Sequence, residues 1–474
     1  MRDDPRPEQR LSPSQHVSRR RLIQGIGAGA TVMLAGCAEE NGNGATEQTP
    51  DDDDETGTEP DDGEEELTAA AYAFTDTAVV GLDTETEATA EVESVPNASW
   101  EDVIATPEYL FAVENGSSEV YVLDPGTDEI TDRIPVGTNP VHGFYAESTD
   151  EVWVHSDDEA QFYVVDAAAP DSVEARVAVG DVGAGHGKVA ATGDGRAVVT
   201  NMEAGGLFVV NLEAKETTEH IEFDADYHSH SHSGHQTLEL LHDAGDDHDH
   251  DDDDHDHDDD DHDHSDGTHY VAYAPESGLA FVEELGGGHH QHSMSGSKET
   301  QRLTARGVSP LHGDDDGGDA RTVVVDVDNA EVEGTIDAGG PTYGADAHEL
   351  VSVIDGDDVH FVDSTDSHGH ADETVTLSDA SPAAVRFGAD GAYTANPHSG
   401  DISILDIESY EELERLSVPG DHLDDMPSVI ADETFATVAA DTAVLVDLES
   451  QDPVQFDVSD IQTVGLLSAG AVTN

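Results

Sequence analysis

Cysteine is almost absent from this sequence, which has one, Cys37, in 474 residues. A lone cysteine cannot form an internal disulfide, and it cannot supply the several thiolates of a soft metal site. Histidine, in contrast, occurs 27 times, and aspartate and glutamate together 107 times. Any metal site in this chain is therefore expected to use imidazole nitrogens and carboxylate oxygens, a donor set that suits zinc first.

Basic residues are also scarce. The chain has 17 lysines and arginines, a formal net charge of -90, and lysine only at positions 188, 215 and 298. Nucleic-acid binding needs basic patches, so nucleic acid is excluded as a partner and cations are expected instead. Such a surface is tolerable where salt shortens the Debye length to roughly 3 Å, and the composition resembles that of an extremely halophilic archaeal protein.

Long hydrophobic runs are missing as well. The apolar segment Leu22–Ala35 is too short to span a bilayer as a stable helix. Residues 18–23 (SRRRLI) resemble a twin-arginine export signal, and residues 34–37 (LAGC) resemble a lipobox. The alternative, a short buried helix with an accidental arginine pair, does not explain both signals. We expect residues 1–37 to direct twin-arginine export, with Cys37 lipid-anchored to the outer face of the cytoplasmic membrane.

Residues 38–66 have no apolar periodicity and repeat acidic residues, glycine and proline. Such a segment cannot bury enough apolar surface to fold. We expect a disordered acidic tether that holds the rest of the chain, residues 67–474, away from the membrane.

Helical periodicity is absent from residues 67–474, where a unit of roughly forty residues repeats instead. Each unit has three or four short strands, as in EVYVLD, QFYVVDA and ISILDIE. The pattern predicts an all-β fold, a single β-propeller of about eight four-stranded blades, with residues 461–467 closing the ring as the inner strand of the first blade. Seven blades are the alternative, because residues 312–379 divide in more than one way, and an open sandwich is a more distant one. The units are expected to begin near residues 67, 99, 142, 186, 235, 312, 382 and 425.

Four consecutive units open on a short phrase that contains histidine: PVHG, AGHG, SGHQ and PLHG. The inner strands of a propeller begin at the mouth of its central channel, so these imidazoles should converge, and three or four of them would form a zinc site without thiolates. The alternative is that each His-Gly pair only caps backbone groups. The four candidate ligands are His142, His186, His235 and His312. His155 and His398 are expected to be either further ligands or surface residues, and His348 and His360 to be structural.

A second group of histidines lies in a stretch from His228 to His264 that mixes imidazoles with carboxylates. Its first part alternates histidine with other residues, which places His228, His230 and His232 on one side of an extended strand. Its second part, the insert 246–268, is an aspartate run that cannot fold alone and is expected to be a disordered loop that collects metal weakly. The loop histidines are His248, His250, His255, His257, His262 and His264. The glycine-rich loop 286–299 adds His289, His290 and His292. The alternative is that the acidic tract only solvates the protein in brine.

The export signal, the strand cadence, the histidine-rich region and the phrases AGHGKVA, SGHQ and PLHG together resemble the AztD-type periplasmic zinc metallochaperones. This resemblance implies a propeller that binds zinc and passes it to the solute-binding protein of a zinc ABC importer. The chain departs from the family by its lipid anchor, its lack of propeller cysteines and its long Asp/His insert.

Other functions compete with zinc capture and delivery. One is a propeller enzyme, such as a lactonase-like hydrolase or a quinoprotein, and another is a surface protein-interaction propeller whose histidines merely tolerate metals. No Gly-x-Ser-x-Gly elbow stands out, and the only cysteine is expected to be lipid-modified. A ring of histidines beside a histidine-rich loop favours capture over turnover. We therefore expect a zinc-binding protein that is not an enzyme.

Overall fold

The computed structural model describes residues 71–467 except 85, 182–184, 224–266, 286–319, 346–348, 367–370, 389–390, 419–427, 432–433, 440–441, 449 and 452. These residues form strands β1 to β32 and the short 3₁₀ turns η2 (Asp157–Glu159) and η4 (Ser364–Asp366). Within them, no helix has the length and apolar character needed to cross a membrane. The predicted export signal, lipid anchor and tether lie outside the described residues.

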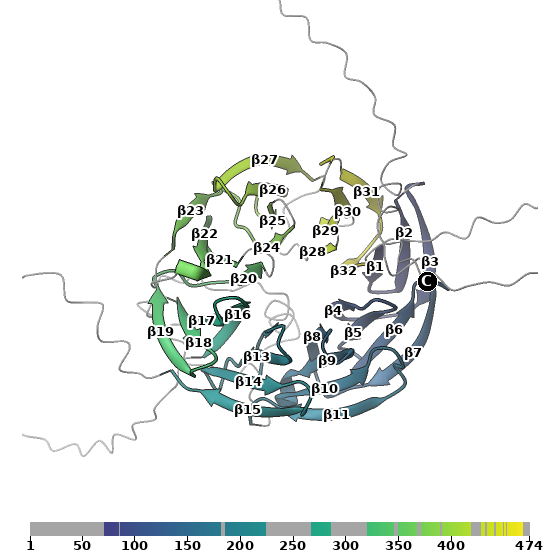
Figure 1. Cartoon of the computed structure of the whole chain (residues 1–474). Coiled ribbons are helices and arrows are strands. Elements are labelled where there is room, and N and C mark those ends of the chain that lie inside the picture. Colours follow the sequence, from purple (N-terminus) through teal and green to yellow (C-terminus); the bar gives the residue numbers. More distant parts are fainter. Residues whose placement is uncertain are drawn as a thin grey trace, which may run out of the picture. The chain divides into compact units, whose positions relative to one another are not determined.

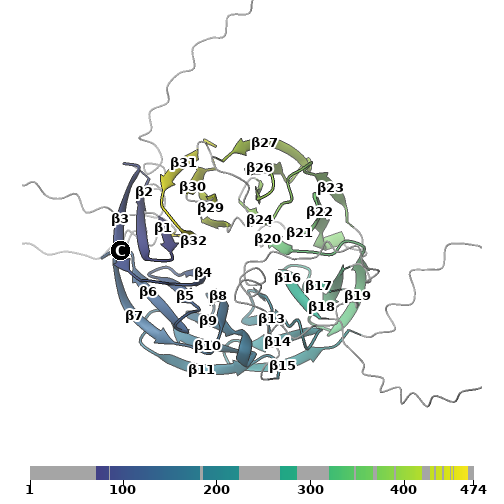
Figure 2. The ribbon, with the colours of Figure 1, turned by 180° about the vertical axis from the view of Figure 1, so that it is seen from behind.

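Eight four-stranded antiparallel sheets are arranged as blades around a central axis (Figure 1; Figure 2). From the innermost strand outward, the first four blades are β32 (Ile461–Leu466), β1 (Ala71–Thr75), β2 (Ala78–Asp83), β3 (Ala88–Ser94); β4 (Trp100–Ala105), β5 (Leu110–Glu114), β6 (Glu119–Asp124), β7 (Glu129–Pro135); β8 (Pro140–Ala146), β9 (Glu151–Ser156), β10 (Gln161–Asp166), β11 (Val173–Ala178); and β12 (Val189–Ala191), β13 (Arg196–Thr200), β14 (Leu207–Asn211), β15 (Glu216–Ile221).

The other four blades are β16 (Thr268–Ala274), β17 (Leu279–Glu284), β18 (Arg321–Asp326), β19 (Glu331–Ile336); β20 (Thr342–Ala345), β21 (Leu350–Asp355), β22 (Asp358–Asp363), β23 (Glu373–Thr376); β24 (Ala384–Phe387), β25 (Ala392–Asn396), β26 (Asp401–Asp406), β27 (Glu411–Ser417); and β28 (Ser428–Ala431), β29 (Thr434–Ala439), β30 (Thr442–Asp447), β31 (Pro453–Asp457). The predicted all-β, eight-bladed propeller is confirmed. The seven-bladed alternative is wrong, because residues 342–376 form one complete blade.

Burial varies from the inside of a blade to its edge. Strands β1, β5 and β9 are buried at every position, because both faces of these strands pack against neighbouring blades. The outermost strand β7 alternates exposed residues with half-buried ones and the buried Ile134, because one of its faces meets solvent. The second strand of each blade, counted from the axis, therefore reads as a continuous run of mostly apolar residues, whereas the innermost strands β4 and β8 are only partly buried and the outermost strands carry acidic residues.

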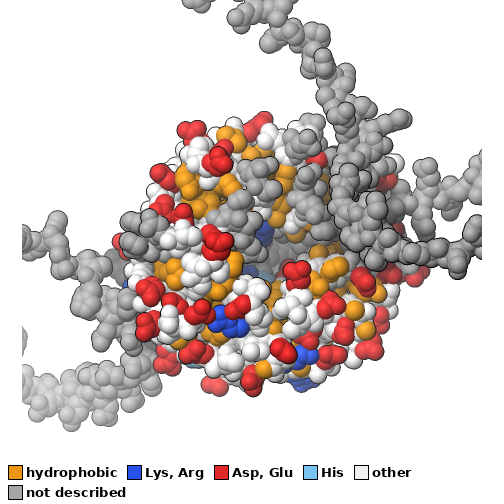
Figure 3. All heavy atoms as spheres, viewed as in Figure 1, with side chains coloured by type: hydrophobic (Ala, Val, Ile, Leu, Met, Phe, Trp, Pro, Cys, Tyr) orange, Lys and Arg blue, Asp and Glu red, His pale blue; other side chains and the backbone are white. Residues whose placement is uncertain are grey.

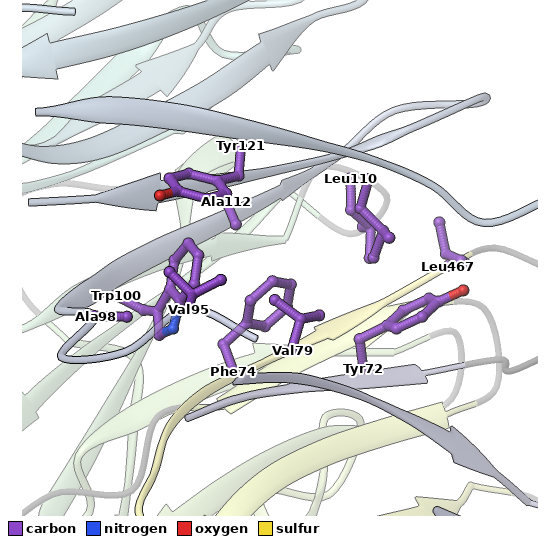
Figure 4. Close-up of a cluster of buried hydrophobic side chains, with 11 residues drawn as sticks. Tyr72, Phe74, Val79, Val95, Ala98, Trp100, Leu110, Ala112, Tyr121 and Leu467 are labelled. Atoms are coloured by element: carbon purple, nitrogen blue, oxygen red, sulfur yellow. The ribbon is translucent and has the colours of Figure 1, made fainter. Parts of the chain in front are cut away.

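The blades are held together by apolar side chains packed between them. Between the first two blades, Phe74 and Trp100 make an edge contact with ring centroids 5.3 Å apart, and within the second blade Trp100 makes another with Tyr121 at 5.1 Å (Figure 4). The indole N–H of Trp100 donates to the carbonyl oxygen of Thr75 at 2.7 Å, so this buried polar group is satisfied. Aromatic burial of this kind stabilises the contact between successive blades.

The ring is closed by the C-terminal strand, as the sequence predicts. Strand β32 pairs antiparallel with β1 and completes the first blade from inside. Its Gln462 also reaches the second blade, since its Oε1 accepts from the backbone N–H of Trp100 at 2.7 Å and its Nε2 donates to the carbonyl of Ala98 at 3.0 Å. One strand thereby joins the two ends of the chain's propeller.

Two blade boundaries differ from the expectation. The innermost strand of the fifth blade begins at Thr268 rather than near His235, and that of the sixth begins at Thr342 rather than near His312. The segment 224–266 joins β15 to β16 between blades, and the segment 286–319 joins β17 to β18 within the fifth blade. The repeat was misread here because two long insertions shift the cadence of short strands.

Candidate metal centre

Three histidines from consecutive blades meet at the wall of the central channel. His142 lies in β8, His186 lies just before β12, and His269 is the second residue of β16. The ring centroids of His142 and His186 are 5.2 Å apart, and those of His186 and His269 are 5.0 Å apart. The Nε2 atoms of His186 and His269 approach to 3.1 Å. Three consecutive blades therefore bring three imidazoles side by side, with His186 between the other two.

Bulges occur where two of these side chains leave their strands. The pairing of β8 with β9 shifts register between Pro140 and His142, and the pairing of β16 with β17 shifts between Thr268 and Val271, on either side of His269. An extra residue in one strand bends it and re-aims a side chain, and bulges are common beside functional sites. The local irregularity thus helps to turn both rings toward the channel.

Glycine follows both His142 and His186, and close backbone approach requires it. A Cβ at Gly143 would lie 2.8 Å from the carbonyl oxygen of Trp153, and a Cβ at Gly187 would collide with the carbonyl oxygen of Thr200. Any larger residue would push the histidine strand away from its neighbour. The His-Gly pairs therefore fix the depth at which the two imidazoles sit.

Each of the three imidazoles directs its Nδ1 toward a carboxylate. Metal-binding histidines in proteins commonly present this arrangement, in which the carboxylate fixes the tautomer and the ring orientation and leaves Nε2 for the metal. The pairs, with the distance from Nδ1 to the carboxylate oxygen, are His142 with Asp102 at 4.0 Å, His186 with Asp157 at 2.7 Å, and His269 with Glu283 at 3.5 Å.

These contacts place lone pairs at the inward nitrogens. Lys188 Nζ lies 2.6 Å from His142 Nε2, and since an ammonium can only donate, that nitrogen is an acceptor. The contact between His186 and His269 depends on their tautomers: when both carry the proton on Nδ1, toward Asp157 and Glu283, the two rings face each other through two lone pairs. Two acceptors cannot hydrogen-bond to each other, but a cation between them satisfies both. Tetrahedral zinc at 2.0 to 2.1 Å holds its nitrogens about 3.3 Å apart, close to the distance seen.

The surroundings keep the imidazoles of His142 and His269 neutral. Burial lowers the pKa of His142 well below its ordinary value, and the charge of Lys188 lowers it further. Burial likewise lowers the pKa of His269 well below its ordinary value. Burial also raises the pKa of Glu283 to about 7. Neutral imidazole is the form that binds metal, so the site is ready to accept a cation at neutral pH.

Lys188 occupies the place that a metal would take beside His142. Correspondingly, within the part of the chain that the structure describes, no three His, Cys, Asp or Glu side chains are already disposed to hold one ion together. The pair His186 and His269 has the spacing for two ligands, and His142 becomes a third only when the Lys188 ammonium moves aside. Loading of the site is therefore expected to displace Lys188.

His155 lies behind the site rather than in it. Its Nδ1 is 3.0 Å from Asp157 Oδ1, its side chain is 2% exposed, and its ring packs against Phe162 at 5.0 Å. Its Nε2 is buried without a hydrogen-bond partner among the described residues. Burial raises the pKa of Asp157, but the hydrogen bonds from His155 and His186 outweigh this effect, and the net pKa is lowered. His155 therefore helps to hold Asp157 ionised and oriented toward His186.

The remaining predicted histidines fall elsewhere. His398 lies in the turn between β25 and β26, and His360 lies on β22, where its Nδ1 is 2.9 Å from Thr374 Oγ1. His348, which was expected to be structural, lies outside the described residues. So do the predicted ligands His235, His312, His228, His230, His232, His248, His250, His255, His257, His262, His264, His289, His290 and His292. The structure does not test these residues.

His269 was missed by the sequence analysis. The phrase SGHQ at His235 matched the local pattern of His142 and His186 and was assigned the position that His269 takes. The signal that marks His269 is the strand pattern THYVAYA immediately after the acidic insert, where a new innermost strand begins. After an insertion, the histidine that begins an innermost strand is found from the next strand pattern in the sequence. Counting about forty residues from the previous blade does not find it.

Asp157→Asn is expected to weaken zinc binding by about 10 to 100-fold. An amide presents its acceptor oxygen to one of the two rings and its NH₂ donor to the other, and it carries no charge. Where the NH₂ faces His186, that ring must carry its proton on Nε2 and lose the ligand lone pair; where the oxygen faces His186, the charge-assisted contact that orients the ring is lost. Zinc titration against a chromophoric chelator measures the change. Asp158→Asn, in the same 3₁₀ turn, is the matched control and should bind as the parent does. Equal affinity in both variants would show that Asp157 does not orient a ligand.

Zinc affinity is expected to depend on pH through proton competition. The lowered pKa values of His142 and His269 mean that both rings are neutral at and above their ordinary pKa of about 6.5, so little affinity is lost there. As pH falls through the lowered values, protons occupy the ligand nitrogens, so affinity should be lost at lower pH than for ordinary histidine ligands. A competition titration from pH 8 to 4 tests this, and affinity that already falls steeply above pH 6.5 would contradict it.

No protein family model matches the chain, and no curated protein matches it by sequence. Among solved structures it is similar to the dihydro-heme d1 dehydrogenase NirN in complex with DHE, with a TM-score of 0.55 and 11% identity over 85% of this chain and 76% of that chain. It also matches AztD from Citrobacter koseri at TM-score 0.48 and 12% identity, over 83% of this chain and 97% of that chain. Apo AztD from the same organism matches at 0.47 and 13%, over 83% and 96%. AztD is thus among its structural neighbours, as the sequence resemblance predicted. At these identities the likeness is one of fold.

The expectation that the chain is not an enzyme is corrected by the similarity to NirN. A dehydrogenase shares this fold over 85% of the chain. The propeller places side chains from several blades around one channel, and such a constellation serves catalysis as readily as binding. The absence of a serine elbow or a cysteine nucleophile therefore does not exclude an enzymatic activity.

Proposed function

We propose that this propeller binds zinc at its channel wall through His142, His186 and His269 and transfers it to the solute-binding protein of a zinc ABC importer. The observation that carries the proposal is the set of three imidazoles with Nε2 directed inward and Nδ1 directed at a carboxylate. Three protein ligands leave a fourth position on tetrahedral zinc. A ligand from an acceptor protein can enter there, which makes stepwise transfer possible without prior release of free zinc.

Metal content tests the binding step. Protein purified without a histidine tag in molar salt, exposed to limiting zinc and dialysed, should retain zinc by elemental analysis at a stoichiometry that drops by one in a His186→Ala variant. Transfer is tested by mixing loaded protein with an apo solute-binding protein in the presence of a chelator that traps free zinc. Zinc that appears only on the chelator would exclude direct transfer.

The segment 224–266 leads directly into the strand that carries His269, and its last histidine, His264, lies five positions before it. We propose that the histidines of residues 246–264 collect zinc weakly and raise its concentration beside the site, to the millimolar range typical of short flexible linkers. Replacing all six histidines in this range by serine, with every aspartate kept, should slow loading at scarce zinc and leave the equilibrium affinity of the tight site nearly unchanged. Stopped-flow kinetics measure the rate of zinc loading, and a chelator titration measures the equilibrium affinity of the tight site. Unchanged kinetics would mean that the segment only solvates the protein.

We also propose export by the twin-arginine route and lipid anchoring through Cys37, in a halophilic host. Two spaced signals support this, LAGC at residues 34–37 and the preceding SRRRLI. Cys37→Ser should move the protein from the membrane fraction to the medium. A variant that stays in the membrane fraction would refute the anchor.

A second candidate is a hydrolytic zinc enzyme, which the same three-histidine set favours because catalytic zinc sites hold three protein ligands and a water. Zinc-loaded protein would then hydrolyse activated esters or lactones with many turnovers, and His186→Ala would not. Loaded protein that transfers zinc but shows no turnover above free zinc supports the first proposal alone.

A further inference from the structure

Lys188 is hydrogen-bonded to one of the three candidate zinc ligands. Its Nζ lies 2.6 Å from His142 Nε2 in a partly buried position, and an ammonium can only donate in such a contact. The lone pair through which His142 would bind zinc is therefore engaged by a side chain of the same protein. A charge-assisted hydrogen bond of this kind is stronger than a neutral one, and burial limits its screening by salt.

The backbone of Lys188 is fixed, so its long side chain is the part that can move. The Lys188 N–H donates to Thr200 Oγ1 at 2.8 Å, and the Lys188 carbonyl oxygen accepts from the N–H of Thr200 at 3.0 Å. Gly187 has no room for a Cβ against the carbonyl oxygen of Thr200. His186 is held on the same segment, because its carbonyl oxygen accepts from the N–H of Met202 at 2.8 Å. The ammonium is thus tethered beside the ligands, which gives it a high local concentration there.

Tyr270 offers the ammonium a contact that does not involve His142. The Nζ of Lys188 is 5.4 Å from the centroid of the Tyr270 ring, within the range of a cation–π contact. Tyr270 follows His269 on β16, and its side chain is buried. Lys188 can therefore leave His142 and keep a favourable contact beside the site.

The charge of Lys188 acts on four groups around the site. Burial has the largest effect on the pKa of each group, which it lowers for His142 and His269 and raises for Asp102 and Glu283, and the Lys188 charge lowers the pKa of all four. The centre of the face seen in Figure 3 is hollowed, with basic and histidine side chains visible inside it. A divalent cation that enters this site meets an ammonium at close range, and the repulsion between two charges is stronger in a buried site than in water.

We propose that Lys188 is a built-in competitor of zinc: it holds His142 when no zinc is bound, gives up this ligand when zinc enters, and takes it back as zinc leaves. This role deepens the proposed zinc transfer and rests on it. The ammonium lowers the equilibrium affinity, because zinc must break its hydrogen bond to His142. It speeds release, because it competes for the lone pair that zinc gives up. Lys188 thereby sets an affinity from which an acceptor protein can take the metal.

The test measures zinc affinity and zinc release in Lys188→Leu, whose side chain is neutral and neither donates a hydrogen bond nor binds metal. A chelator competition titration of the full chain, at pH 8 in molar salt, should give an affinity about ten- to hundredfold higher than that of the parent. The rate at which excess chelator removes zinc from loaded protein should fall. Lys188→Arg, which keeps the positive charge and the donors, should remain close to the parent.

Arg176→Leu is the matched control. Arg176 lies over the ring of Tyr163 at 4.8 Å on the outermost strand β11, so its loss removes one positive charge and one ring contact outside the channel. Arg176→Leu should bind zinc as the parent does. An affinity that rises as much in Arg176→Leu as in Lys188→Leu would assign the effect to net charge and overturn the proposal.

A double-mutant cycle shows whether Lys188 acts through His142. In a His142→Ala background, the increase in affinity caused by Lys188→Leu should shrink, because the lone pair that Lys188 occupies is gone. An undiminished increase there would overturn the competition for His142. Unfolding curves show whether each variant is folded, and Lys188→Gln serves if Lys188→Leu is not, with a smaller increase expected.

The same measurements separate this inference from the proposed function. If His186→Ala loses zinc but Lys188→Leu binds and releases it as the parent does, only the competitor role is wrong. If neither the parent nor Lys188→Leu binds zinc, the proposed function is wrong and the competitor role with it.

Discussion

Replacing His186 by alanine is expected to weaken zinc binding by more than about 100-fold, beyond the effect of losing an outer-shell partner. His186 lies between the other two imidazoles, with its Nε2 3.1 Å from that of His269 and its ring 5.2 Å from that of His142. Its removal leaves two ligands on opposite sides of a gap, and two imidazoles alone do not form a tight tetrahedral site. A chelator competition titration measures the change.

His360→Ala is the matched control for this experiment. His360 lies on β22 and hydrogen-bonds to Thr374, outside the channel, so its loss should leave zinc affinity and thermal stability close to those of the parent. Tight binding that survives His186→Ala would place the site elsewhere, in the histidine-rich segments outside the described residues.

Deleting residues 461–474 is expected to abolish the cooperative unfolding transition. The deletion removes β32, which leaves β1 as an unpaired edge and uncovers the fully buried Tyr72 and Phe74 on it. It also removes Gln462, whose amide joins the first blade to the second. An open edge of this length promotes aggregation as well as unfolding.

Calorimetry in molar salt compares this deletion with one of residues 468–474 only, which keeps β32 intact. The shorter deletion should unfold cooperatively within a few degrees of the parent. A cooperative transition of parental enthalpy in the longer deletion would show that the ring does not depend on its C-terminal strand.

The sequence allowed the fold to be predicted because strand cadence is a local property. Short buried runs such as LFAVE and VVVD recur with turns between them, and each blade repeats the same sequence of strands. The first repeat unit has one strand too few, so residues 461–467 could be predicted to supply its inner strand and close the propeller ring. The predicted starts of the fifth and sixth blades were wrong because of two insertions. An insertion has no strand pattern of its own, so the sequence does not show where it ends and the next strand begins.

The site could be predicted only in part. His142 and His186 stand in similar His-Gly phrases, and their glycines are required by close strand packing, so a local pattern identified both. Their carboxylate partners come from other strands; Asp157, for example, is 29 positions from His186. No local pattern reports such a pairing. Lys188 was recognised as a rare residue, but its contact with His142 depends on how two blades meet.

The central claim is that His142, His186 and His269 hold zinc together, and an anomalous difference map at the zinc edge tests it most directly. Crystals of the zinc-loaded protein should show one strong peak in the channel, about 2.0 to 2.1 Å from the Nε2 atoms of all three histidines, with Lys188 moved away from His142. A channel without a peak, or a strong zinc peak held by other residues while Lys188 still contacts His142, would contradict the account.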